Sequence, residues 1–179
     1  VAASLARRGW MVDVLDSAPG PASGASGLPA GLLAPHTSPD DGVLSRLSRS
    51  GVRITLQQSR LLLREGVDWR QTGLLERLVD GRTALPAPWN EAGCDWTVRA
   101  SAQRLAQAAL ASDTLAIWHT QAAWIKPARL VISLLSCPCI AWHGNARVAA
   151  LAPLESGWQV LDADQRVLAT ADMVVVAAG

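Results

Sequence analysis

The stretch Val1–Asp16, VAASLARRGWMVDVLD, decides the fold class of this 179-residue chain. Its first nine residues are small and apolar apart from two arginines, and they end in Gly9, which predicts a short helix closed by glycine. Residues 11–15 predict a short strand, which stops at Asp16 and the turn residues 17–20. Helix, glycine, strand and acid form the second half of a βαβ unit, so we expect the first strand and its glycine-rich loop just before Val1.

The overall composition is that of a folded globular protein. Half of the residues are hydrophobic and 17% are charged, which supplies a core and argues against disorder. The formal net charge of +1 gives no general attraction to nucleic acid or to membranes. Because the sequence contains no tyrosine, a catalytic tyrosine is excluded.

The cysteines and the apolar runs predict a cytoplasmic protein without a metal site. Cys137-Pro138-Cys139 is one residue short of a C-x-x-C pair and, together with Cys94, is typical of incidental thiols in a reducing compartment. Arg7 and Arg8 follow the first apolar stretch and do not precede it, which argues against a signal peptide. The apolar runs are shorter than the ~18–20 residues that span a bilayer.

Residues 19–42 hold a cluster of glycine and proline that becomes apolar at 32–35. A glycine-rich stretch that is also apolar favours close contact with a ligand over a solvated linker. The strongest helix pattern follows at residues 43–64, with Asp40 or Asp41 as its cap. Its apolar stripe is made of Leu44, Leu47, Gly51, Ile54, Gln58 and Leu61.

A second stripe on this helix is made of Arg46, Arg49, Arg53, Arg60 and Arg64. A solvated face is the ordinary interpretation of such a stripe, and a face that contacts the phosphates of a nucleic acid is the alternative.

The remaining sequence predicts a discontinuous domain with an insertion. Residues 67–126 hold short strand-like pieces around a proline-rich turn at 85–89 and a helix at 100–111. Pro127 opens a helix over 128–135, and short strands separated by turns predict a β-meander over 140–177. We therefore expect an α/β fold with a three-layer, Rossmann-like dinucleotide-binding domain at 1–66 and 127–179, and an inserted antiparallel-sheet substrate domain at 67–126.

Two segments carry the candidate cofactor chemistry. An acid at the end of the second strand, here Asp16, can accept hydrogen bonds from both ribose hydroxyls of a dinucleotide. The segment 24–33, GASGLPAGLL, exposes backbone N–H groups beside small residues, and Ser26 adds a hydroxyl donor. A tight turn before a helix is the structural alternative for this segment.

These segments resemble the flavin-site signature of the D-amino-acid oxidase and glycine oxidase (DAO) superfamily. The resemblance covers nearly the whole chain in order and rests on Asp16 and on residues 25–27, 31–33, 123–131, 147–151, 157–160 and 171–179. Within the superfamily, residues 25–35 and 44–46 are most similar to the MnmC-type oxidoreductase domain of bacteria. That resemblance implies FAD-dependent oxidation of the carboxymethylaminomethyl group on the wobble uridine of tRNA.

The resemblance also implies roles for individual residues. The residues implied to bind FAD are Asp16 and Ser17 at the adenosine ribose, Ala25 and Ser26 at the pyrophosphate or ribityl chain, Ala30, Gly31 and Leu32 along the isoalloxazine ring, and Val148 at the adenine. His36 follows this segment and is the candidate acid-base residue, although a lone histidine is more often structural. His119 and His143 rank below it.

Several alternatives stay open at this point. Residues 34–36 read Ala-Pro-His where the MnmC-type pattern has a tyrosine-containing stretch, so glycine or another small amino acid is the alternative substrate. A non-catalytic module and an NAD-dependent dehydrogenase are rivals from other classes. The sequence starts without methionine and ends on a buried-strand pattern at 173–179, so we expect a fragment that lacks the first glycine-rich loop, is itself inactive and binds FAD poorly.

Overall fold

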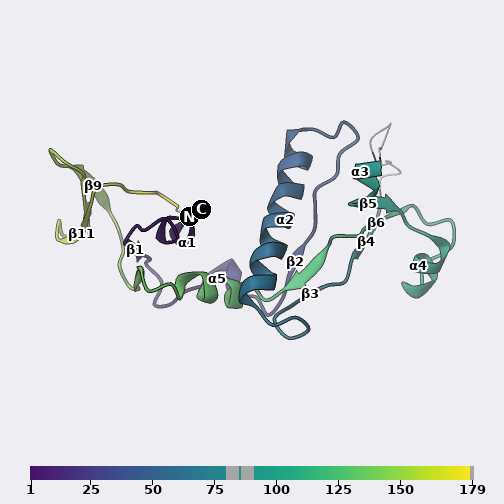
Figure 1. Cartoon of the computed structure of the whole chain (residues 1–179), viewed down its shortest axis with the longest axis horizontal. Helices are drawn as coiled ribbons and strands as arrows, with labels where there is room; N and C mark the ends of the chain where they lie inside the picture. Colours follow the sequence, from purple (N-terminus) through teal and green to yellow (C-terminus); the bar gives the residue numbers. More distant parts are fainter. Residues whose placement is uncertain (80–84, 86–90, 178–179) are drawn as a thin grey trace. The chain divides into compact units, whose positions relative to one another are not determined.

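The computed structural model describes residues 1–79, 85 and 91–177 of the chain. These residues form two compact units. Unit 1 combines Val1–Gly27 with Val131–Gly179, and unit 2 is the continuous segment Leu28–Leu130. The mixture of helices and several sheets confirms the α/β class (Figure 1).

Unit 1 is built on a parallel strand pair and a separate meander. Its elements are α1 (Ala2–Ala6), β1 (Val12–Leu15), the 3₁₀ turn η1 (Ala25–Gly27), the end of α5 (Pro127–Leu135), β8 (Ile140–His143), β9 (Ala150–Pro153), β10 (Trp158–Leu161) and β11 (Val167–Ala171). Strands β1 and β8 are parallel, with Val12 opposite Ile140. The other three form an antiparallel sheet in the order β11-β10-β9, which confirms the expected meander over residues 150–171. The rest of that prediction is wrong: β8 pairs with β1, and residues 173–177 form no strand, with Val176 73% exposed.

The start of unit 1 follows the sequence prediction closely. After α1, the Gly9 N–H donates to the Ala6 carbonyl and the Trp10 N–H donates to the Leu5 carbonyl. Gly9 has φ +89°, the left-handed conformation that closes a helix and that glycine adopts without a steric penalty. The chain then turns directly into β1, so the helix, glycine and strand lie where the pattern predicts them.

Unit 2 contains two antiparallel sheets and the long helix. Its elements are β2 (Gly31–Leu33), α2 (Val43–Leu62), β3 (Trp69–Gln71), β4 (Leu74–Arg77), α3 (Glu91–Cys94), β5 (Thr97–Arg99), α4 (Ala102–Gln107), β6 (Ala116–His119), β7 (Ala123–Ile125) and the start of α5. The sheets have the strand orders β2-β7-β3 and β4-β6-β5. Helix α2 packs on the first sheet through Val52, Leu56, Trp69, Ala123 and Ile125.

Helix α2 buries a different face from its apolar stripe. The buried residues are Ser45, Val52, Leu56 and Ser59, while Leu47 and Ile54 stay 63% and 58% exposed. Serines suit the buried face because they are small and because their hydroxyls find local partners. The Ser59 hydroxyl donates to the Thr55 carbonyl at 2.8 Å.

The expected aspartate cap of α2 is wrong. Gly42 is the N-cap residue, and its position makes no side-chain cap hydrogen bond. The Asp40 carboxylate accepts from the Ser38 hydroxyl at 2.6 Å, and Asp41 pairs with Arg49. Both carboxylates therefore have partners other than the first amides of the helix.

The two compact units do not follow the expected domain boundaries. Strand β7 pairs with both β2 and β3, so hydrogen bonding ties residues 28–66 to residues 67–126 within unit 2. The compact units are defined by contacts within the chain, whereas the expected domains are defined by what each would bind. The domain boundaries at 66/67 and 126/127 therefore stay a prediction.

Candidate cofactor site

Asp16 is exposed directly after β1, at the carboxyl end of the parallel pair β1-β8. Its Oδ1 accepts from the Ala18 N–H at 2.8 Å and so closes the following turn. Its backbone carbonyl accepts from the Ala146 N–H at 2.9 Å, which brings the segment after β8 beside it. The carboxyl end of parallel strands is where open α/β sheets bind ligands.

The segment after β8 holds Val148, which is 42% exposed. The Asn145 N–H donates to the Ala18 carbonyl at 3.0 Å, and the Ala149 N–H donates to the Leu161 carbonyl at 2.8 Å. The structure thus fixes residues 145–149 between the turn after β1 and the meander. Asp16 and the segment that holds Val148, which lie far apart in the sequence, are therefore neighbours within unit 1.

Ala25 and Ser26 lie in η1, also in unit 1. The Gly27 N–H donates to the Gly24 carbonyl at 2.9 Å and closes this turn. A Cβ placed on Gly27 would lie 2.7 Å from the Ala22 carbonyl oxygen, so the tight turn requires glycine here. Ala25 is exposed and Ser26 is half-buried, which leaves small side chains on the outside of the turn.

Ala30, Gly31 and Leu32 belong to unit 2, at the start of β2. A Cβ on Gly31 would lie 3.0 Å from Pro127 Cγ, so this glycine permits the close packing of β2 on the first turn of α5. Leu32 follows Gly31 in the strand, so its side chain points to the other face of the sheet, where it is 64% exposed.

Two residues that the sequence reasoning missed share the face of Leu32. Trp124 on β7 is directly opposite Leu32, and Arg70 on β3 is directly opposite Trp124. Directly opposed residues of antiparallel strands point to the same face, so a row of leucine, tryptophan and arginine crosses the sheet on the side away from α2. Because side chains alternate along a strand, the sequence could have placed Arg70 on the face opposite Trp69. It does not show that β3 pairs with β7.

His36 and His119 differ in their surroundings. His36 has an exposed side chain, while its backbone N–H donates to the Ser48 hydroxyl at 2.9 Å. His119 is buried, with Nδ1 3.0 Å from Thr97 Oγ1 and Nε2 2.8 Å from Glu76 Oε2. Those two contacts tie β6 to both neighbouring strands, so His119 is a structural residue of this sheet.

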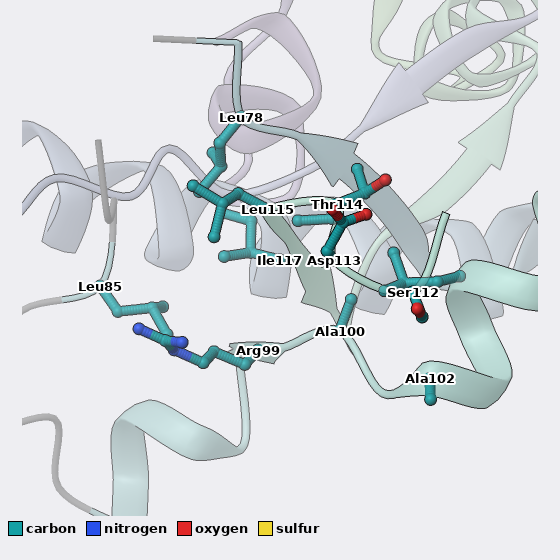
Figure 2. A pocket seen from close by; sticks show the side chains of 12 residues that line it. Leu78, Leu85, Arg99, Ala100, Ala102, Ser112, Asp113, Thr114, Leu115 and Ile117 are labelled. Atoms are coloured by element: carbon teal, nitrogen blue, oxygen red, sulfur yellow. The ribbon is translucent and has the colours of Figure 1, made fainter. Parts of the chain in front are cut away.

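The hollow in Figure 2 lies elsewhere in unit 2, and none of the expected cofactor residues lines it. Its volume is about 240 Å³, and Leu78, Leu115 and Ile117 gather on one side of it. Ligand sites for drug-sized molecules usually have about 300–1,000 Å³. The hollow is therefore too small to enclose a flavin.

Metal-ligand clusters, cysteines and long apolar helices are the remaining features to consider in the described residues. Within residues 1–79, 85 and 91–177, no group of three or more His, Cys, Asp or Glu side chains could hold a metal ion. The cysteines Cys94, Cys137 and Cys139 are free. In the same residues, no helix is both long and apolar enough to cross a membrane.

A protein-family model described as "DAO: FAD dependent oxidoreductase" matches residues 1–179. The chain belongs to this family. Membership in the DAO family confirms the resemblance read from Asp16 and from the segments along the rest of the chain, and the family is described as FAD-dependent oxidoreductases, so FAD is its cofactor.

Curated relatives of this DAO chain are named tRNA 5-methylaminomethyl-2-thiouridine biosynthesis bifunctional protein MnmC. The relative from Polaromonas naphthalenivorans (strain CJ2) is 55% identical over 185 residues, which cover 100% of this chain and 29% of the relative. The relative from Verminephrobacter eiseniae (strain EF01-2) is 53% identical over 188 residues, covering 99% of this chain and 30% of the relative. The chain thus spans less than a third of the length of these relatives.

Solved oxidase structures share the fold of this DAO chain. A fructosyl peptide oxidase matches 99% of the chain with a TM-score of 0.68 at 16% identity, and the match covers 46% of that oxidase. Iminodiacetate oxidase (IdaA) from Chelativorans sp. BNC1 matches 94% with a TM-score of 0.63 at 19% identity, over 49% of its own chain. These identities support a shared fold only.

Proposed function

We propose that this chain is part of an FAD-dependent enzyme that oxidises a C–N bond of carboxymethylaminomethyl-uridine at the tRNA wobble position and so removes the carboxymethyl group. The observation that carries the proposal is the identity of 55% over the whole chain to a relative named for biosynthesis of a tRNA methylaminomethyl-thiouridine. A tRNA substrate also makes the cytoplasm the expected compartment.

The residues of unit 1 fit the adenosine end of FAD. Asp16 is exposed, and only one of its carboxylate oxygens has a partner within the described residues, so Oδ2 can accept from ribose hydroxyls. Ser17 is exposed beside it, and Val148 would contact adenine through its backbone. Ala25 and Ser26 would contact the pyrophosphate or the ribityl chain.

The residues of unit 2 fit the ring end of the cofactor. Ala30, Gly31 and Leu32 would lie along the isoalloxazine, with Leu32 offering an exposed apolar surface. When bound, FAD supplies the acceptor for the hydride that leaves the amine substrate. His36 stays the candidate acid-base residue, since its backbone is fixed to α2 and its side chain is exposed.

The fold proposed for the complete enzyme is a three-layer FAD-binding domain formed by residues 1–66 and 127–179. Residues 67–126 form the inserted substrate domain. The sheet β4-β6-β5, which lies within the inserted segment, supports this division because its strands pair only with one another among the described residues.

The test uses the full-length protein with bound FAD, mixed without oxygen with tRNA that carries the carboxymethylaminomethyl group. We expect loss of flavin absorbance near 450 nm and appearance of the aminomethyl nucleoside. Glycine is the parallel substrate. Reduction by glycine and not by tRNA would reject the tRNA substrate, and reduction by neither would reject amine oxidation of both kinds.

A further inference from the structure

Helix α2 carries a row of cations along one flank. The helix contains four arginines and no acidic residue between Val43 and Leu62. Arg46, Arg53 and Arg60 follow one another at seven-residue intervals, which is close to two helical turns, so they lie on the same flank. All three are exposed, and the row extends over about 21 Å of helix.

Two of these arginines lie over tryptophan rings. The Arg53 guanidinium is 5.5 Å from the centroid of Trp96, and that of Arg60 is 5.9 Å from the centroid of Trp69. Arg60 also donates one hydrogen bond to the Gln71 side-chain oxygen at 3.0 Å. A guanidinium has five N–H donors in a plane, so a stacked arginine with one such partner keeps further donors for an anion.

Arg49 lies beside this row but is neutralised. It donates to both carboxylate oxygens of Asp41, at 2.6 and 3.0 Å, and its side chain is only 16% exposed. No described carboxylate lies within ion-pair distance of Arg46, Arg53 or Arg60, although Arg46 is near enough to Asp41 to help lower the pKa of that carboxyl. The helix therefore contains both paired and exposed arginines.

We propose that the row Arg46–Arg53–Arg60 binds the phosphodiester backbone of the RNA substrate. The inference rests on the proposed function, because a tRNA is the polyanion that this enzyme would meet. Three exposed cations without interspersed acids complement a chain of phosphates, and the planar fork of arginine matches phosphate geometry. Contacts to phosphates carry no sequence information, so the row contributes affinity without sequence preference.

The experiment measures binding of tRNA to the full-length, FAD-loaded protein over a series of salt concentrations. Wild type should show a steep fall in affinity with salt, with a slope near −0.7 to −0.9 on a log–log scale for each phosphate contacted. The triple variant Arg46→Gln, Arg53→Gln, Arg60→Gln should lose about two to three units of that slope, and each single variant should lose roughly three- to tenfold in affinity near 0.1 M salt.

Two sets of variants make the result specific. Replacing the same three residues with lysine keeps the charges and should retain most of the slope. The double variant Asp41→Asn, Arg49→Gln removes the paired arginine of the same helix together with its partner and leaves the net charge unchanged, so its slope should equal that of wild type. Flavin absorbance and thermal melting report whether each variant is folded.

The outcomes separate this inference from the function itself. A triple glutamine variant with the wild-type slope overturns the inference even if the wild-type enzyme converts tRNA. Equal loss in the double variant Asp41→Asn, Arg49→Gln also overturns it, because the effect would then not depend on the three exposed arginines. Wild-type enzyme that binds tRNA without salt dependence overturns the phosphate contact, whereas conversion of glycine in place of tRNA overturns the proposed function.

Discussion

Replacing His119 with leucine tests whether this histidine is structural and not catalytic. The side chain is 1% exposed and stands in β6, between β4 and β5. Leucine keeps an apolar side chain of similar size but removes both ring nitrogens. Glu76 on β4 and Thr97 on β5 each lose a hydrogen-bond partner.

The expected loss of stability follows from how far Thr97 and Glu76, the two hydrogen-bond partners of His119, are exposed to water. The hydrogen bond to Thr97, which is fully buried, is worth about 1 kcal/mol, with up to about 1 more because the contact of this hydroxyl with Thr37 Oγ1 is long, at 3.4 Å. Glu76 is 51% exposed, so water can replace the imidazole and the loss there is about 1 kcal/mol. The free energy of unfolding should fall by about 2–3 kcal/mol.

His143 provides the matched control. Its Nε2 lies 2.6 Å from Asp13 Oδ1, so the pair has the same chemistry, but the two side chains are 50% and 56% exposed. His143→Leu should therefore cost less than about 1 kcal/mol. Urea unfolding followed by circular dichroism, with hydrogen exchange of the β6 amides, measures both variants. Equal losses for the two variants would refute the argument from burial.

Substitutions at Asp16 and at Asp41 test the cofactor site and the start of α2. In the full-length protein, Asp16→Ala should weaken FAD binding about tenfold to a hundredfold, since it removes a charged acceptor worth roughly 1.5–3 kcal/mol. Titration with the flavin measures the affinity. Asp16→Asn keeps an acceptor for the Ala18 N–H, so it separates loss of the ribose contact from loss of the turn. Asp41→Asn should lower the free energy of unfolding by less than about 1 kcal/mol at pH 7. Hydrogen bonding from Arg49 holds the pKa of Asp41 below its ordinary value, so this contribution is complete above the unfolded pKa and disappears as the pH falls below about 4. Unfolding measured from pH 7 to pH 2.5 checks it, and a difference that persisted at low pH would contradict the assignment.

Short-range chemistry determined much of unit 1. Gly9 must adopt a positive φ to end α1 and release β1, and this requirement is visible in the sequence because only glycine adopts it without a steric penalty. Pro127 likewise marks the start of α5, since a proline at the first position of a helix sacrifices no hydrogen bond. Family membership could be read from the order of such segments.

Only the tertiary structure decided which residues meet across the strands and which face of a helix is buried. Helix α2 has an apolar stripe, yet it packs through Ser45, Val52, Leu56 and Ser59, because the hydroxyls are satisfied locally and small side chains allow close approach to the sheet. Periodicity gives the angle between side chains on a helix but not the element that packs against it. The sequence by itself determined the local turns, the strand after α1 and the family; the buried His119 and the neighbours of Leu32 depend on strand register, which is set by contacts between residues far apart in the chain.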